Sequence, residues 1–115
     1  MAQQIQRPAP IEIEEILNEV RRRLIEAAHP EKIILFGSYA RGDFDKHSDL
    51  DVLVILREAR NRFDEMARLY GVLRGIGMPT DIIVYTSDQV EARKNLRGTM
   101  LYHALVEGRI LYDAA

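Results

Sequence analysis

The sequence predicts an α+β domain, in which helices pack on a small mixed β-sheet, in two layers at the simplest and three at most. The length of 115 residues is enough for one core but not for two, and the hydrophobic fraction of 47% is ordinary for a globular protein. Segments with helical spacing of apolar residues alternate along the chain with short apolar runs typical of strands. Such alternation indicates a layered α and β fold, and a single domain over residues 1–115 accounts for the chain.

The first predicted helix begins at Pro10 and ends before the His29-Pro30 step. Apolar residues recur there at helical spacing, with acidic residues early and arginines late, which suits the helix dipole. Proline is favoured in a first helical turn, whereas a residue that precedes proline is pushed out of the helical region. Residues 1–9 are expected to form a flexible tail.

The first predicted strand is the apolar run Lys32–Phe36, which ends at Gly37. A short helical turn over Ser38–Arg41 follows. The second predicted strand, Asp49–Leu56, is β-branched and apolar after its first three residues. Its acidic start is unusual, because aspartate is depleted in strands.

The second half of the chain continues the alternation, with glycine or proline between most of its segments. The spacing of Thr86 and Gln89 is that of a capping box, which marks a helix start. In order, the predicted elements are a helix over Ala59–Arg74, a strand over Thr80–Tyr85, a helix that opens at Thr86 and that Gly98 interrupts, and an edge strand over Arg109–Tyr112.

Composition excludes several classes of function. With 18 acidic and 16 basic residues the formal charge is -2, so no global positive field favours an extended nucleic acid. Cysteine is absent, so a metal ion has to be held by oxygen or imidazole. No apolar run approaches the roughly 20 residues that span a bilayer, and the start does not resemble a signal peptide. We therefore expect no membrane partner and a cytoplasmic location.

The acidic start of the second strand predicts a metal site. Side chains alternate along a strand, so Asp49 and Asp51 are expected to share one face. Two carboxylates so close repel each other and raise each other's pKa unless a cation lies between them. Mg²⁺ suits this role, because it prefers oxygen ligands and is usually bound by one or two carboxylates plus the phosphates of a substrate.

Asp81 is the candidate third carboxylate. It lies near the start of the third predicted strand, and neighbouring strands are only about 4.8 Å apart. Three convergent aspartates can hold the two ions of a nucleotidyl or phosphoryl transfer site. The alternative interpretation is a simple strand-start or turn residue after Pro79.

Gly37 and Ser38, at a junction of strand and helix, are candidate phosphate-binding residues. Glycine lets a phosphate approach the backbone, and free N–H groups at a helix start attract anions. The segment has no lysine, so it is not a Walker A loop, and taken alone it could be a helix cap. Arg41 could bind a phosphate or pair with an acid such as Asp43 or Asp45.

The remaining polar and aromatic candidates receive no role in the site. The histidines are too scattered along the sequence to form a ligand cluster, and four of the tyrosines are expected in the core or at an interface. These residues are His29, His47, His103, Tyr70, Tyr85, Tyr102 and Tyr112.

Gly37, Ser38, Asp49 and Asp51 together form a pattern that resembles the signature of the DNA polymerase β-type nucleotidyltransferases. A Gly-Ser pair is followed about ten residues later by two acids one residue apart, and Asp81 matches the third acid. The sequence is more closely similar to the minimal nucleotidyltransferases, which are often paired with a HEPN-domain partner. The resemblance implies the polymerase β-like fold over about residues 33–112.

The resemblance also implies roles and partners. Asp49 and Asp51 would bind two Mg²⁺ ions, Asp81 would position or deprotonate the attacking hydroxyl, and Gly37 with Ser38 would hold the triphosphate of ATP. Members that pair with a HEPN toxin act as antitoxins, and some adenylylate a tyrosine of that toxin.

Three functions follow as hypotheses. The first is transfer of AMP from ATP to a hydroxyl of a HEPN-type protein partner. The second is an antitoxin that neutralises its partner mainly by binding. The third, transfer to a small molecule, is disfavoured because no segment of the sequence suggests a substrate domain, although a homo-oligomer or hetero-oligomer interface could substitute.

Overall fold

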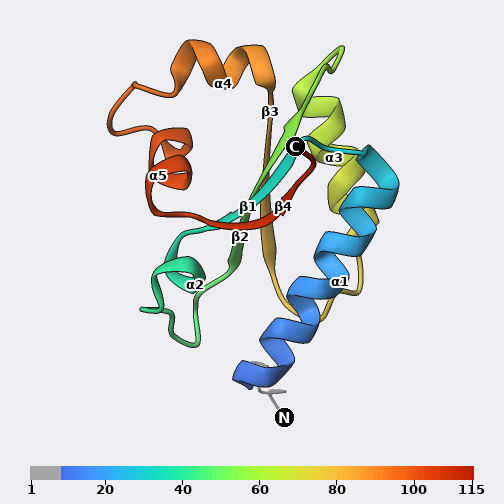
Figure 1. The fold of residues 1–115 in the computed structure, drawn as a ribbon. Coiled ribbons are helices and arrows are strands. Elements are labelled where there is room, and N and C mark those ends of the chain that lie inside the picture. The colour runs from blue at the N-terminus through green and yellow to red at the C-terminus, as the bar shows by residue number, and fades with distance from the viewer. Residues whose placement is uncertain (1–8) are drawn as a thin grey trace.

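The computed structural model describes residues 9–115, so the tail predicted for residues 1–9 lies outside the described residues except for Ala9. The predicted order of helices and strands is confirmed (Figure 1). The elements are α1 (Pro10–Ala28), β1 (Lys32–Phe36), α2 (Ser38–Arg41), β2 (Leu50–Leu56), α3 (Arg62–Val72), β3 (Thr80–Thr86), α4 (Ser87–Arg93), α5 (Met100–Glu107) and β4 (Arg109–Asp113).

Helix α1 begins and ends as its sequence predicts. Pro10 occupies the first turn, and the Glu12 carboxylate accepts a hydrogen bond from the Ala9 N–H at 3.3 Å. The helix ends at His29, which takes the left-handed conformation with φ 45° and donates its N–H to the Ile25 carbonyl. The buried stripe of α1 faces the sheet and consists of Ile13, Leu17, Val20 and Leu24.

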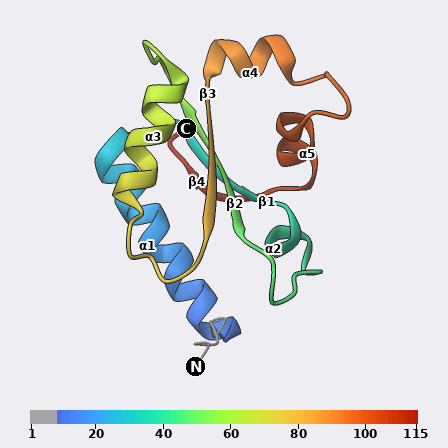
Figure 2. The same cartoon turned by 180° about the vertical axis from the view of Figure 1, so that it is seen from behind.

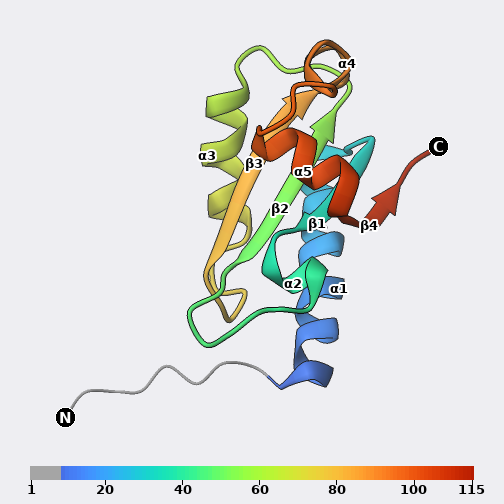
Figure 3. The same cartoon turned by 90° about the vertical axis from the view of Figure 1, so that its left-hand side faces the viewer.

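The four strands form one mixed sheet in the order β3-β2-β1-β4. Strand β1 is antiparallel to both β2 and β4, whereas β2 and β3 are parallel. Figure 3 shows β2 and β3 running side by side from the end of the sheet where α2 lies. Parallel pairing brings the starts of β2 and β3 to the same end of the sheet. Asp49 and Asp51 lie at the start of β2, and Asp81 lies at the start of β3.

Helices cover both faces of the sheet, so the domain has three layers (Figures 1 and 2). On one face, Val52 and Val54 of β2 pack with the buried residues of α1 and α3. On the other face, Leu53 and Ile55 pack with Leu101 of α5. Burial on both faces explains why β2 is almost continuously apolar after Asp51.

Three predicted ends differ from the structure by one or two residues, since α3 ends at Val72, β3 at Thr86 and β4 at Asp113, and two predicted starts also differ. Strand β2 starts at Leu50, which leaves Asp49 in the preceding loop. Helix α3 starts at Arg62 instead of Ala59, because the Asn61 side chain caps it by accepting hydrogen bonds from Phe63 N at 2.9 Å and Asp64 N at 3.2 Å.

The predicted capping box is confirmed, since Thr86 and Gln89 exchange side-chain and backbone hydrogen bonds at the start of α4. The predicted interruption is also confirmed: residues 94–99 separate α4 from α5, and the Thr99 hydroxyl caps α5. Within residues 9–115, no helix combines the length and the apolar character that a membrane crossing requires.

Candidate functional site

One pocket gathers every residue that the sequence marked for chemistry. It lies at the starts of β2 and β3, on the face of the sheet that α5 covers in part. Gly37 and Ser38 enter it from the end of β1, and Arg41 from α2. Its lining consists of Phe36, Gly37, Ser38, Arg41, Ser48, Asp49, Asp51, Asp81, Met100, His103 and Glu107.

Asp51 lies at the centre of this pocket. The strand register places it opposite Asp81 on β3 and opposite Phe36 on β1. Partial burial raises the pKa of Asp51 to about 6, with the charges of Asp81 and Asp49 adding to the increase and the Arg41 charge opposing it. The protein therefore holds a carboxylate in a place where negative charge is poorly compensated.

Gly37 is required by both its backbone conformation and its surroundings. Its φ of 73° lies in the left-handed region, and a Cβ at this position would overlap Oδ2 of Asp51. The Gly37 carbonyl also accepts the N–H groups of Ala40 and Arg41, both at 3.1 Å, as α2 begins. The turn expected to bind phosphate is thus packed directly against the central carboxylate.

Arg41 forms ion pairs with two acids in this structure. Its Nε lies 3.3 Å from Asp43 Oδ1, and its Nη1 lies 3.5 Å from Glu107 Oε2. Both carboxylates raise the pKa of Arg41. Of the two acids considered from the sequence, Asp43 is therefore the partner, whereas the Asp45 carboxylate accepts the His47 N–H at 2.7 Å. Exposed pairs of this kind are weak, so a phosphate can displace them.

Sequence reasoning missed the contribution of α5. Met100, His103 and Glu107 line the pocket, whereas the sequence indicates no role for His103. His103 Nδ1 lies 3.6 Å from Glu107 Oε1, so this carboxylate is shared between His103 and Arg41. The spacing of His103 and Glu107 places them on one helix face, but no local signal shows that α5 folds over the acidic edge.

The three aspartates fit a hard divalent cation whose coordination is completed by a substrate. Within the described residues 9–115, no group of three or more His, Cys, Asp or Glu side chains is arranged to hold an ion. Asp49, Asp51 and Asp81 therefore share a pocket without converging on one point. Mg²⁺ needs only one or two protein carboxylates when substrate phosphates supply other ligands. Burial, with the charges of Asp81 and Asp49, raises the pKa of Asp51, so a positive charge placed here would stabilise its carboxylate.

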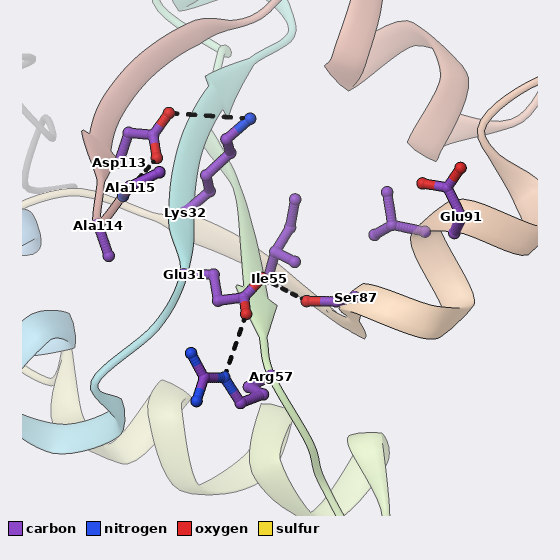
Figure 4. A pocket seen from close by; sticks show the side chains of 10 residues that line it. Glu31, Lys32, Ile55, Arg57, Ser87, Glu91, Asp113, Ala114 and Ala115 are labelled. Atoms are coloured by element: carbon purple, nitrogen blue, oxygen red, sulfur yellow. Dashed lines mark hydrogen bonds and ion pairs between the residues drawn. The ribbon is translucent and has the colours of Figure 1, made fainter.

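A second pocket lies away from these acids and is lined by Glu31, Lys32, Arg57, Ser87 and Asp113 among others (Figure 4). Four of its charged side chains are already paired with one another. The Glu31 carboxylate accepts hydrogen bonds from the Ser87 hydroxyl and from Arg57 Nε, and Lys32 Nζ lies 3.8 Å from Asp113. The hydrogen bond from Ser87 is the main cause that lowers the pKa of Glu31. The pocket that contains Asp49, Asp51 and Asp81 is therefore the candidate active site.

Comparison with known proteins gives the family of the chain. Residues 13–110 match the family described as "Nucleotidyltransferase domain". Because this match spans most of the chain, the protein belongs to the nucleotidyltransferase domain family.

Its relatives within this family include protein adenylyltransferases. A "Putative protein adenylyltransferase" of Methanocaldococcus jannaschii is 46% identical over 50 residues, which cover 42% of this chain and 50% of that protein, so the match spans about half of that relative. Protein adenylyltransferase MntA of Thermococcus cleftensis is 30% identical over 93 residues, which cover 79% of this chain and 92% of MntA. The chain is homologous to MntA.

Solved structures confirm the fold. The crystal structure of a "putative nucleotidyltransferase" from Sulfolobus solfataricus aligns with a TM-score of 0.64 at 22% identity, covering 90% of this chain and 83% of that one. A chain of a toxin-antitoxin crystal structure with AMP-PNP aligns with a TM-score of 0.53 at 19% identity, covering 84% of this chain and 73% of that one. The α+β nucleotidyltransferase fold predicted from the sequence is therefore correct.

Proposed function

We propose that this protein transfers AMP from ATP to a hydroxyl group of a protein partner of HEPN type and thereby acts as its antitoxin. The observation that carries the proposal is the register of Asp51 with Asp81, beside the Gly37 turn, in one pocket. Two comparisons support it: the homologue MntA is named a protein adenylyltransferase, and the toxin-antitoxin structure contains AMP-PNP.

Each side chain has a distinct task in this proposal. Gly37 and Ser38 bind the triphosphate through backbone N–H groups and the serine hydroxyl. Asp49 and Asp51 would hold Mg²⁺, and Asp81 would be a further ligand on the acceptor side. When bound, Mg²⁺ supplies positive charge against the negative charge that develops on the phosphates. Arg41 exchanges its exposed carboxylate partners for a phosphate oxygen.

The transfer itself is a substitution at the α-phosphorus of ATP. The acceptor hydroxyl oxygen forms a new bond to this phosphorus while the bond to the β-phosphate oxygen breaks, and pyrophosphate leaves. Asp81 orients the acceptor hydroxyl and takes up its proton. The products are an AMP ester of the partner, pyrophosphate and the proton that Asp81 takes up, so atoms and charges balance without a further reactant.

The test uses labelled ATP, Mg²⁺ and the protein encoded by the adjacent gene. We expect the wild type to transfer label to this partner and the Asp49→Asn/Asp51→Asn variant to lose at least about 100-fold of the rate. A matched control, Asp64→Asn/Asp88→Asn, removes the same charge from α3 and α4 and is expected to label normally. Equal labelling by wild type and the Asp49/Asp51 variant would exclude the proposal.

The second candidate function is neutralisation by binding alone. It is favoured by exposed apolar side chains on α5 and β4: Met100, Val106 and Ile110 are 57%, 64% and 55% exposed, and Met100 lines the pocket. A growth-rescue assay separates the two functions. If the Asp49→Asn/Asp51→Asn variant protects cells from the partner as well as wild type does, binding is sufficient and catalysis is dispensable.

A further inference from the structure

Tyr70 of α3 reaches the outer edge of the sheet beside Asp81. Strand β3 pairs with β2 alone in the sheet order, so backbone groups along its other side lack a strand partner. The Tyr70 hydroxyl oxygen accepts the Ile82 N–H at 2.9 Å. A side chain from α3 thus satisfies the backbone donor next to the third acid.

The same hydroxyl also contacts the Asp81 carboxylate, with its oxygen 3.4 Å from Oδ1. A phenol hydroxyl has one proton. Because its oxygen accepts from Ile82, that proton is free to be donated to Asp81. The direction of both hydrogen bonds is therefore defined, and the Ile82 N–H orients the hydroxyl that holds the carboxylate.

Asp81 is the acid for which such support matters. Asp51 is only partly exposed and packs against the Gly37 backbone, whereas Asp81 is exposed at the edge of the sheet. An exposed aspartate samples several rotamers, and ordering it on a metal costs conformational free energy. A hydrogen bond that restricts it beforehand reduces this cost, as partners of metal ligands commonly do.

We propose that Tyr70 is a positioning residue for Asp81: its hydroxyl, oriented by the Ile82 N–H, keeps the carboxylate directed for metal binding and acceptor orientation. This inference rests on the proposed function and adds to the site a residue from α3. Tyr70 is 42% exposed, so its hydroxyl can be removed without opening a cavity in the core.

The first experiment measures Mn²⁺ affinity by titration calorimetry in the presence of AMP-PNP, so it does not depend on turnover. Tyr70→Phe retains the ring and removes the hydroxyl, and we expect it to bind Mn²⁺ about 10-fold more weakly than wild type. Tyr85→Phe removes a hydroxyl from the same strand as Asp81 and is the matched control, expected to bind as wild type. All titrations are made well below each variant's thermal midpoint.

A double-mutant cycle separates positioning from a general structural effect. Asp81→Asn alone should weaken Mn²⁺ binding, and adding Tyr70→Phe to it should cause no further loss, because the hydroxyl acts through this carboxylate. Fully additive losses would overturn the inference. So would wild-type Mn²⁺ affinity in Tyr70→Phe when Asp81→Asn binds weakly.

Kinetics provide a second measurement with a different signature. In the labelling assay Tyr70→Phe should lower kcat about 10-fold and change the KM for ATP less than about 2-fold, because Gly37 and Ser38 are untouched. A KM effect as large as the kcat effect would contradict a positioning role. Failure of the proposed function is distinguishable: the wild type itself would then label no partner, or Asp81→Asn would bind Mn²⁺ normally.

Discussion

The backbone of Gly37 lies so close to the Asp51 carboxylate that a side chain on residue 37 would overlap Asp51 Oδ2. This contact joins the end of β1 to the second residue of β2, so the turn proposed to bind phosphate and the central acid form one unit. It also explains why glycine is needed here for reasons beyond its φ of 73°.

Gly37→Ala should therefore be far more harmful than a substitution at a similar glycine. Gly42 also has a positive φ, of 88°, but a Cβ there would meet no atom within 4 Å. We expect Gly42→Ala to cost about 1 kcal/mol of unfolding free energy and Gly37→Ala about 2–4 kcal/mol, since strain and overlap add. Chemical denaturation measures both. Equal losses in the two variants would show that the contact with Asp51 is unimportant.

Stability should depend on pH through Asp51. Its pKa is raised from an ordinary value of 3.8 to about 6, so the folded state binds this proton more tightly than the unfolded state does. The contribution of Asp51 to the free energy of unfolding is complete below about pH 4. It falls as the pH rises from about 4 to about 6, and it is absent at higher pH. After a discount for solvent screening we expect a loss of about 1–2 kcal/mol over this range.

The matched variant is Asp51→Asn, compared with Asp113→Asn as a control at an exposed position. Unfolding free energies are measured from pH 4 to 8 for both. Asp51→Asn should remove this decline and be more stable than wild type at pH 8 without metal. A wild-type pH profile in Asp51→Asn would rule out Asp51 as its source.

Glu107 should oppose nucleotide binding, because it pairs with Arg41 at 3.5 Å. Glu107→Gln should lower the KM for ATP about 2–3-fold, in keeping with a weak exposed pair, whereas Arg41→Ala should raise it about 10-fold. Glu91→Gln on α4 is the control. The measurement is the KM for ATP at low and high salt, and an unchanged KM in Arg41→Ala would remove Arg41 from the nucleotide site.

The attachment of α5 depends on Gly108. A Cβ at this position would overlap the Ala104 carbonyl oxygen and Cγ2 of Ile34, although the φ of -73° is unstrained. Gly108→Ala should cost about 1–3 kcal/mol by overpacking. Gly71→Ala, within α3, meets no atom within 4 Å and should stabilise by about 0.5–1 kcal/mol. Thermal unfolding of both variants checks that Gly108→Ala lowers the stability and Gly71→Ala raises it. Destabilisation by Gly71→Ala would contradict the packing argument.

Local patterns in the sequence were sufficient to predict the order of helices and strands and the two local groups of candidate site residues. Helical and strand periodicity depend on nearby residues, so α1, β1 and the capping box of α4 could be predicted directly. Asp49 and Asp51 are separated by one residue, and Gly37 and Ser38 lie at one junction. Short-range geometry therefore indicated a site for a metal ion and phosphate, and the resemblance of the same residues to the nucleotidyltransferase signature implied the nucleotide.

Tertiary structure decided the rest, because it depends on which surfaces pack together. The pairing of Asp51 with Asp81 follows from the parallel register of β2 and β3, which the apolar residues facing both layers determine. The same packing folds α5 over the acidic edge and brings Tyr70 of α3 to Asp81. No spacing in the sequence encodes these contacts, since the residues belong to different elements that meet only through the shared core.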